Sequence, residues 1–279
     1  MKLGFFGINV GACADPDTAV RVARAAEAAG LESLWTGEHV VLPDPQVPPS
    51  PSAPDVPFLD PAVSLAFVAA ATERIRLGTG IIILPQRNPL VLAKELASVD
   101  VVSRGRLLFG LGVGYLEPEF RALGIPLERK GARSEDYLAA ILALWTQPKP
   151  AHRGKFTSFE GIQAMPRPVQ QPHPPIVIGG LTPTALRRAV RLGDGWYGFG
   201  LDLSSTKHLI DGLAAAEKEL GRPAGKGRLE ISVTPFERLD REKVERYAEI
   251  GVDRIIVFQP AETTDDALRG VERIAALAR

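Results

Sequence analysis

Short apolar runs alternate with longer, partly polar segments along this chain, and the alternation repeats eight times. The runs have strand length and few polar residues, as strands of a parallel sheet with both faces covered do. The segments between them repeat apolar residues at helical spacing. Expected strands are Leu3–Ile8, Ser33–Thr36, Ile75–Leu84, Arg106–Gly112, Pro175–Gly179, Gly195–Phe199, Leu229–Thr234 and Arg254–Phe258. Expected helices are Pro16–Ala29, Pro61–Thr72, Pro89–Val102, Arg133–Trp145, Thr184–Leu192, Ser204–Leu220, Arg241–Ile250 and Thr264–Ala278.

Eight successive βα units indicate a (β/α)8 TIM barrel. An open doubly wound sheet is the alternative, but such sheets usually have about five or six strands. A barrel can hold 279 residues in one domain, so a single domain over residues 1–279 is expected. Helix-start signals agree with this order, because Asp60 precedes Pro61, and Asp15 and Asn88 precede the first and third expected helices.

Two proline-rich segments interrupt the alternation. Residues 43–61 hold eight of the 24 prolines, and residues 146–175 hold seven. The first follows the second strand, so it is expected to be an extended loop on the carboxyl face of the barrel, where active sites form. The second is an insertion before the fifth strand, expected partly on the opposite face, with His152–Ile162 as a candidate small hairpin.

Charge and cysteine content exclude several classes of protein. Lys+Arg and Asp+Glu both number 33, so no net charge favours nucleic acid or an anionic membrane, and no apolar run is long enough to span a bilayer. Cys13 is the only cysteine, which excludes an intramolecular disulfide. His152, His173 and His208 lack metal-ligand spacing, so no metal is predicted. The start of the chain lacks signal-peptide features, and a cytoplasmic location is expected.

The stretch Ile75–Phe120 carries the strongest signal for a ligand site. Its first strand contains Gly78-Thr79-Gly80, and its second opens into Gly112-Val113-Gly114. Glycines at the carboxyl ends of parallel strands let a ligand approach the backbone. The run Gly110–Gly114 has the wrong spacing for a dinucleotide fingerprint.

Three titratable residues are candidates for chemistry at the barrel mouth. Glu38 and His39 follow the second strand, and a histidine there can exchange a proton near neutral pH. The alternative is a histidine that only caps a loop. Glu117 follows the fourth strand, where it would pair with His39, act as an acid, or be a solvated residue beside Glu119.

Gly179, Gly180, Leu181 and Thr182 join the fifth strand to the fifth helix. Free N–H groups, hydroxyls and a helix N-terminus make this junction a candidate phosphate cradle. A capped turn without a ligand is the alternative.

Three segments together resemble the bacterial luciferase-like flavin and deazaflavin oxidoreductases: AGLESLWTGEH, RIRLGTGIIILPQRNPLVLAKELASVDVVSRGRLLFGLGVGYLEPEF and PPIVIGGLTPTALRRAVRLGDGW. The resemblance runs from about Lys2 to about Leu203. It is greatest to the group that depends on coenzyme F420, since that group shares the long proline-rich loop and the ALGIP sequence at Ala122–Pro126.

The resemblance implies a non-prolyl cis peptide bond between Gly80 and Ile81 that backs the ring of the cofactor. It implies proton chemistry at His39, and an acidic catalytic role for Glu117 like that in deazaflavin-dependent sugar-phosphate dehydrogenases. Pro43 stands where those dehydrogenases carry a tryptophan, so their substrate is not expected. The implied cofactor contacts are Glu38, Thr79, Gly80, Ile81, Gly112, Val113, Gly114, Gly179, Gly180, Leu181 and Thr182.

These observations predict an F420-dependent oxidoreductase that transfers a hydride between the deazaflavin and a largely apolar small organic substrate. An FMN-dependent monooxygenase that uses oxygen is the alternative, and a flavin-binding protein without catalysis is a third possibility. A homodimer is implied by the family resemblance.

Overall fold

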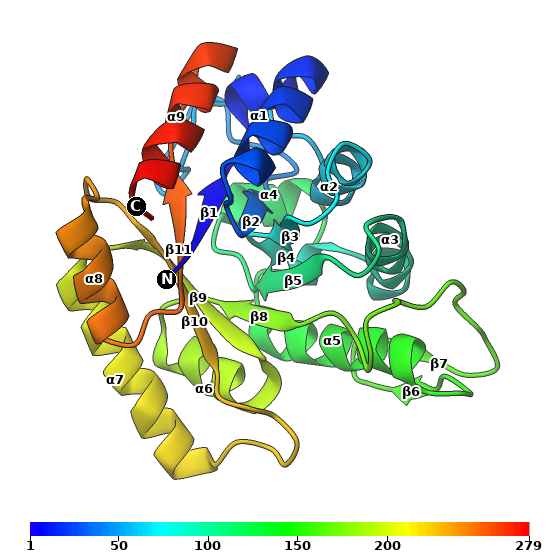
Figure 1. Cartoon of the computed structure of the whole chain (residues 1–279). Helices are drawn as coiled ribbons and strands as arrows, with labels where there is room; N and C mark the ends of the chain where they lie inside the picture. Colours follow the sequence, from blue (N-terminus) through cyan, green and yellow to red (C-terminus); the bar gives the residue numbers. More distant parts are fainter. Residues whose placement is uncertain (279) are drawn as a thin grey trace.

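The strands close into a barrel with the helices outside it (Figure 1). The computed structural model describes residues 1–278, so Arg279 of the expected 1–279 domain lies outside the described residues. The sheet order is β3-β2-β1-β11-β10-β9-β8-β5-β4, every neighbouring pair is parallel, and a further β3–β5 pairing closes the ring. The predicted (β/α)8 barrel is confirmed.

The strands of the barrel are β1 (Lys2–Phe6), β2 (Ser33–Thr36), β3 (Arg76–Thr79), β4 (Ile82–Ile83), β5 (Leu107–Gly112), β8 (Ile176–Gly179), β9 (Gly195–Leu201), β10 (Glu230–Pro235) and β11 (Arg254–Phe258). The α-helices are α1 (Pro16–Ala28), α2 (Pro61–Ala69), α3 (Pro89–Val102), α4 (Glu117–Ala122), α5 (Lys130–Thr146), α6 (Pro183–Leu192), α7 (Leu203–Leu220), α8 (Arg241–Glu249) and α9 (Thr264–Ala276). Two 3-10 helices, η1 (Gly11–Ala14) and η2 (Leu84–Gln86), and a hairpin of β6 (His152–Arg153) and β7 (Ser158–Phe159) complete the elements.

Local sequence signals explain most of the helix starts. The carboxylate of Asp60 accepts hydrogen bonds from the N–H groups of the first turn of α2, and the Asn88 amide does the same for α3. Asp15 caps α1 by accepting from the Thr18 N–H at 2.9 Å. Each of these caps precedes a proline at the first helical position, where the missing N–H costs nothing.

Two elements differ from the sequence expectation. The strand expected over Ile75–Leu84 is broken into β3 and β4, because the chain turns at the cis bond between Gly80 and Ile81. The loop expected after β5 contains the short helix α4, which the sequence interpretation missed. The small hairpin expected within residues 152–162 is confirmed as β6 and β7.

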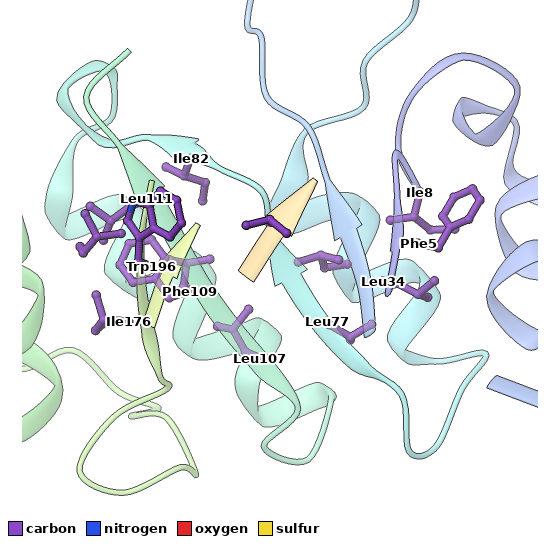
Figure 2. Close-up of a cluster of buried hydrophobic side chains, with 14 of the residues drawn as sticks. Phe5, Ile8, Leu34, Leu77, Ile82, Leu107, Phe109, Leu111, Ile176 and Trp196 are labelled. Atoms are coloured by element: carbon purple, nitrogen blue, oxygen red, sulfur yellow. The ribbon is translucent and has the colours of Figure 1, made fainter. Parts of the chain in front are cut away.

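The main core lies between the barrel strands and the surrounding helices. Alternate residues of β5, namely Leu107, Phe109 and Leu111, point outward into it (Figure 2). Leu108 instead points into the barrel, where it belongs to a second cluster with Trp35 and Tyr197. Successive side chains of a strand point alternately into the barrel and outward to the helices, and both sides are buried. Each strand therefore appears in the sequence as a continuous apolar run.

Among the described residues, no helix is both long enough and apolar enough to cross a membrane.

Candidate active site

The carboxyl end of β2 places Glu38 and His39 at the mouth of the barrel, and both side chains are nearly inaccessible to solvent. The Glu38 carboxylate accepts from the Ile83 N–H and from Arg87, which also donates to Asp60 Oδ2 at 2.7 Å. Burial raises the pKa of Glu38, while the Arg87 guanidinium acts in the opposite direction. Glu38 therefore ties β2 to β4 and to the start of α2, and a contact with a cofactor stays a prediction.

The partner of His39 is Glu119 of α4. Nδ1 of His39 lies 3.3 Å from Oε2 of Glu119, and the Val40 N–H donates to Oε1 at 2.6 Å. Glu119 is completely buried. Burial works against its charge, but the hydrogen bonds from His39 and Val40 lower the pKa of this carboxyl below its usual value. A buried carboxylate thus fixes one ring nitrogen of His39 and leaves Nε2 for another partner.

The expectation that Glu117 pairs with His39 is wrong. Glu117 is half exposed and forms an ion pair with Arg121 one turn later in α4, at 2.8 Å. Residues two apart on a helix point to nearly opposite sides, so only one of Glu117 and Glu119 faces the barrel. Pro118 was the sequence signal for a helix start here, and buried Phe120 marks its inner face. A proton-carrying role for Glu117 stays a prediction.

Aromatic rings border His39 and the rest of the mouth. Phe58, from the proline-rich loop, meets the His39 ring edge to face at 5.7 Å, and Tyr115 does so at 6.3 Å. A wall of rings follows the carboxyl ends of β1, β9, β10 and β11: Phe6, Phe199, Phe236 and Phe258. The sequence interpretation missed this wall, because its members come from four separate strands.

The peptide bond between Gly80 and Ile81 is cis, as predicted. The Ile81 side chain fits between two glycines: a Cβ atom added to Gly112 or Gly179 would lie 2.1 or 2.6 Å from Ile81 Cδ1. Thr79 donates from its hydroxyl to the Gly110 carbonyl at 2.6 Å. These positions therefore have a packing role, and their contact with a cofactor stays a prediction.

Two neighbouring predicted contacts lie just beyond β5. Val113 is half-buried, and Gly114 has a φ of 73° that favours glycine. The Gly114 carbonyl accepts from Lys130 Nζ at 2.6 Å. The start of α5 is thus fastened to the β5 loop at the mouth.

The junction between β8 and α6 has open backbone donors. Gly180 adopts a φ of 129°, and its carbonyl accepts from Trp196 Nε1 at 2.9 Å. Thr182 caps α6 by accepting from the Ala185 N–H at 3.3 Å. Leu181 is exposed, and within residues 1–278 neither its N–H nor that of Thr182 donates to a protein group. The junction brings together the predicted residues Gly179–Thr182 at a helix N-terminus.

Within the described residues, no three His, Cys, Asp or Glu side chains gather as a metal site would require.

The family model of the luciferase-like monooxygenases matches residues 3–279. An uncharacterised protein of Mycobacterium tuberculosis is 33% identical over 270 residues, which are 93% of this chain and 93% of that protein. The oxygenase component of a flavin-dependent trigonelline monooxygenase from Acinetobacter baylyi is 31% identical over 179 residues, 63% of this chain and 46% of that protein.

Among solved structures, an F420-dependent secondary alcohol dehydrogenase in complex with an F420-acetone adduct superposes with a TM-score of 0.80. It covers 100% of this chain and 99% of its own, at 15% identity, and so shares the fold. The match of the family model over nearly the whole chain is stronger evidence. This chain belongs to the luciferase-like monooxygenase family, whose members are F420- or flavin-dependent oxidoreductases.

Proposed function

We propose that the protein is an F420-dependent oxidoreductase that transfers a hydride between the deazaflavin and a largely apolar small organic substrate. The observation that carries the proposal is the His39–Glu119 pair, buried at the barrel mouth and bordered by aromatic rings. The fold shared with the F420-dependent alcohol dehydrogenase along the whole chain supports it.

The donor groups at the mouth fit a phosphorylated ring cofactor. The free N–H groups of Leu181 and Thr182 at the start of α6 would hold the phosphate. Gln86 of η2 is buried, and its amide interacts with the Glu119 carboxylate, whose pKa it helps to lower. The amide oxygen of Gln86 has no hydrogen-bond partner within residues 1–278, so a hydrogen-bond donor on the ligand would satisfy it, because an unpaired buried polar atom is costly. F420, when bound, would supply hydride chemistry at C5 of its ring.

His39 would carry the proton that accompanies the hydride. Its Nδ1 faces the Glu119 carboxylate, so the ring is held in one orientation with Nε2 toward the mouth. The aromatic wall at the mouth would keep water away from the reacting atoms and would bind an apolar substrate.

An FMN-dependent monooxygenase that uses oxygen is the second candidate. The 31% identity to a flavin-dependent monooxygenase component favours it. The same cradle and the same His39–Glu119 pair would serve this cofactor, since FMN also carries a phosphate and a polar ring.

Titration of the purified protein with F420 and with FMN, followed by fluorescence, separates the two candidates. We expect F420 to bind more tightly. Tighter binding of FMN by a factor of about ten, which is about 1.4 kcal/mol, would replace the first candidate with the second.

We also propose that the protein forms a homodimer through α2 and α3. Helix α2 consists almost entirely of apolar residues, and α3 is largely apolar but also carries Lys94, Glu95 and Asp100. Val63 and Phe67 lie one turn apart on α2, and Val91 and Val102 lie three turns apart on α3, and all four are exposed. The two helices are neighbours on the outside of the barrel (Figure 1). A second copy of the chain would bury this surface.

A further inference from the structure

A cavity of about 480 Å³ opens at the carboxyl ends of β1 and β11, and it shares Phe6 and Phe258 with the aromatic wall described above. Its walls come from three segments: residues 5–13, 52–57 and 258–262. Backbone hydrogen bonds join them, because the Gly11 N–H donates to the Pro57 carbonyl at 3.1 Å and the Ala12 N–H donates to the Ala261 carbonyl at 3.4 Å. The cavity is therefore an intrinsic part of the fold.

The walls are mainly apolar and partly aromatic. Phe6 and Phe258 meet edge to face with their centroids 5.6 Å apart, and Val10 and Val56 also line the space. Cys13 adds a thiol that stays neutral, since burial raises its pKa to about 12. A ligand would bury a ring or another bulky apolar group against these walls.

The charged residues that line the cavity are both acidic. Asp55 and Glu262 form no ion pair or hydrogen bond within residues 1–278. The cation that comes near is Arg273, which donates to the lining residue Gln259 at 2.8 Å and does not itself line the cavity. Uncompensated carboxylates beside aromatic faces attract positive charge, because both features stabilise a cation.

The cavity adjoins the predicted reaction site. Phe6 also packs against Phe199 at 5.1 Å and lies 3.4 Å from the place that a Cβ of Gly80 would take. Pro57 is followed by Phe58, whose ring contacts His39. A molecule seated in the cavity would thus lie one side chain away from His39 and from Gly80.

We propose that this cavity binds the substrate, and that the substrate is an aromatic or bulky apolar molecule with one positive charge, of the quaternary or protonated amine class. That the bound molecule is the substrate rests on the proposed function. That the cavity binds a cation does not. The aromatic walls hold the apolar body, and Asp55 and Glu262 select the charge.

Three probes of similar shape test the charge preference on the full chain without cofactor. Phenyltrimethylammonium is the cation, tert-butylbenzene is the neutral molecule of the same shape, and benzenesulfonate is the anion. Calorimetric or ligand-observed NMR titrations should give a dissociation constant for the cation at least about fivefold below that of the neutral probe, with the anion weakest. Added salt should weaken binding of the cation alone. Equal or tighter binding of the neutral or anionic probe would overturn the proposal.

Variants of the cavity residues test whether the probes bind there. The double variant Asp55→Asn and Glu262→Gln should lose the preference for the cation, and both side chains are exposed, so folding should be unaffected. Glu272→Gln, an exposed carboxylate on α9, is the matched control and should keep the preference. Ala261→Phe should fill the cavity and weaken binding of the cationic and neutral probes together. A double variant with the preference intact, or an Ala261→Phe variant that binds like wild type, would contradict the proposal.

The two proposals fail separately. A protein that binds neither F420 nor FMN but still prefers the cation would overturn the proposed function and keep the cavity assignment. A protein that binds F420 but shows no preference among the probes would overturn the cavity assignment and keep the proposed function.

Discussion

His39 and Glu119 meet across 80 residues of sequence because each follows a barrel strand at the same end of the sheet. The contact gives the imidazole a buried, charged partner on one ring nitrogen only. A side chain held in this way can pass a proton through its free nitrogen without changing its orientation. The proposed proton chemistry therefore depends on two residues with different roles.

We expect His39→Ala to lower turnover by roughly 10²–10⁴-fold, as loss of a general acid or base does. Cofactor affinity should change much less. The assay needs a substrate whose reaction includes proton transfer, because artificial dyes can bypass that step. Turnover near that of wild type would make His39 a structural residue.

Glu119→Gln tests the positioning role. The amide keeps the size of the side chain but loses the negative charge, so turnover should fall and its pH profile should change, while the fold is retained. Glu117→Gln is the matched control on the same helix, since Glu117 contacts only exposed Arg121, and a smaller effect is expected. A larger loss with Glu117→Gln would favour the predicted catalytic role of Glu117 over the role of Glu119.

Elements, not single residues, would build the proposed phosphate cradle. Helix α6 is ten residues long, and its N-terminus supplies both free N–H groups and the positive end of the helix dipole. The positive φ of Gly180 turns the chain from β8 into that helix. Any larger residue at Gly180 would be strained there and would also approach the Ala185 Cβ at 2.8 Å, so the cradle is better tested at exposed Leu181.

Leu181→Glu should weaken binding of phosphorylated cofactor, because it places a negative charge beside the phosphate. Leu181→Gln, which has the same shape without the charge, should bind nearly normally. Riboflavin, which lacks the phosphate, should bind both variants alike. Fluorescence titrations measure the affinity of each variant for the phosphorylated cofactor and for riboflavin. If the two variants bound FMN or F420 equally well, the cradle would lie elsewhere.

The hairpin of β6 and β7 is fastened to α5 through Asp136. This carboxylate lies 2.9 Å from His152 Nε2 and accepts from the N–H groups of Phe156 at 2.8 Å and Thr157 at 3.1 Å. Burial works against its charge, but these hydrogen bonds lower the pKa of Asp136 overall. A lowered pKa in the folded state stabilises the fold above the unfolded-state pKa of about 3.9, and this contribution is lost as the pH falls through the folded-state pKa.

Asp136→Asn should therefore lower the melting temperature at neutral pH, and the difference from wild type should shrink as the pH falls below about 4. Glu160→Gln is the control on the same hairpin, since Glu160 is exposed and contacts only exposed Arg153. Thermal unfolding followed by circular dichroism at both pH values gives the answer. A pH-independent difference would mean that charge on Asp136 is unimportant.

At the scale of the whole molecule, exposed apolar side chains of α2 and α3 lie on neighbouring helices outside the barrel. The barrel covers the inner sides of the two helices and leaves Val63, Phe67, Val91 and Val102 exposed. A symmetric pair of molecules is the commonest way to cover such a surface.

Phe67→Arg should convert the dimer to monomers, because two like charges would face each other across the symmetric interface. Leu220→Arg, at an exposed apolar position on α7, should leave the dimer intact. Sedimentation velocity measures the mass of both variants and of the wild type. A monomeric wild type, or a dimeric Phe67→Arg variant, would contradict the proposed interface.

The order of the elements and the type of barrel follow from the sequence by itself, because the signals for them are local. Apolar runs mark the strands, and Asp15, Asp60 and Asn88 mark helix starts at positions that the structure confirms. Such features depend on neighbours in the chain, so a single sequence contains them. The cis bond at Gly80–Ile81 was predicted instead from the resemblance of its stretch to a known family.

The tertiary structure alone decided which residues meet. Glu117 and Glu119 look alike in sequence, and only the packing of α4 against the barrel turns Glu119 toward His39. Gly112 and Gly179 were predicted from the sequence as ligand contacts, and the tertiary structure adds that both make room for Ile81. Contacts across many residues depend on how strands close and helices dock. Long-range packing of this kind leaves no local pattern in the chain.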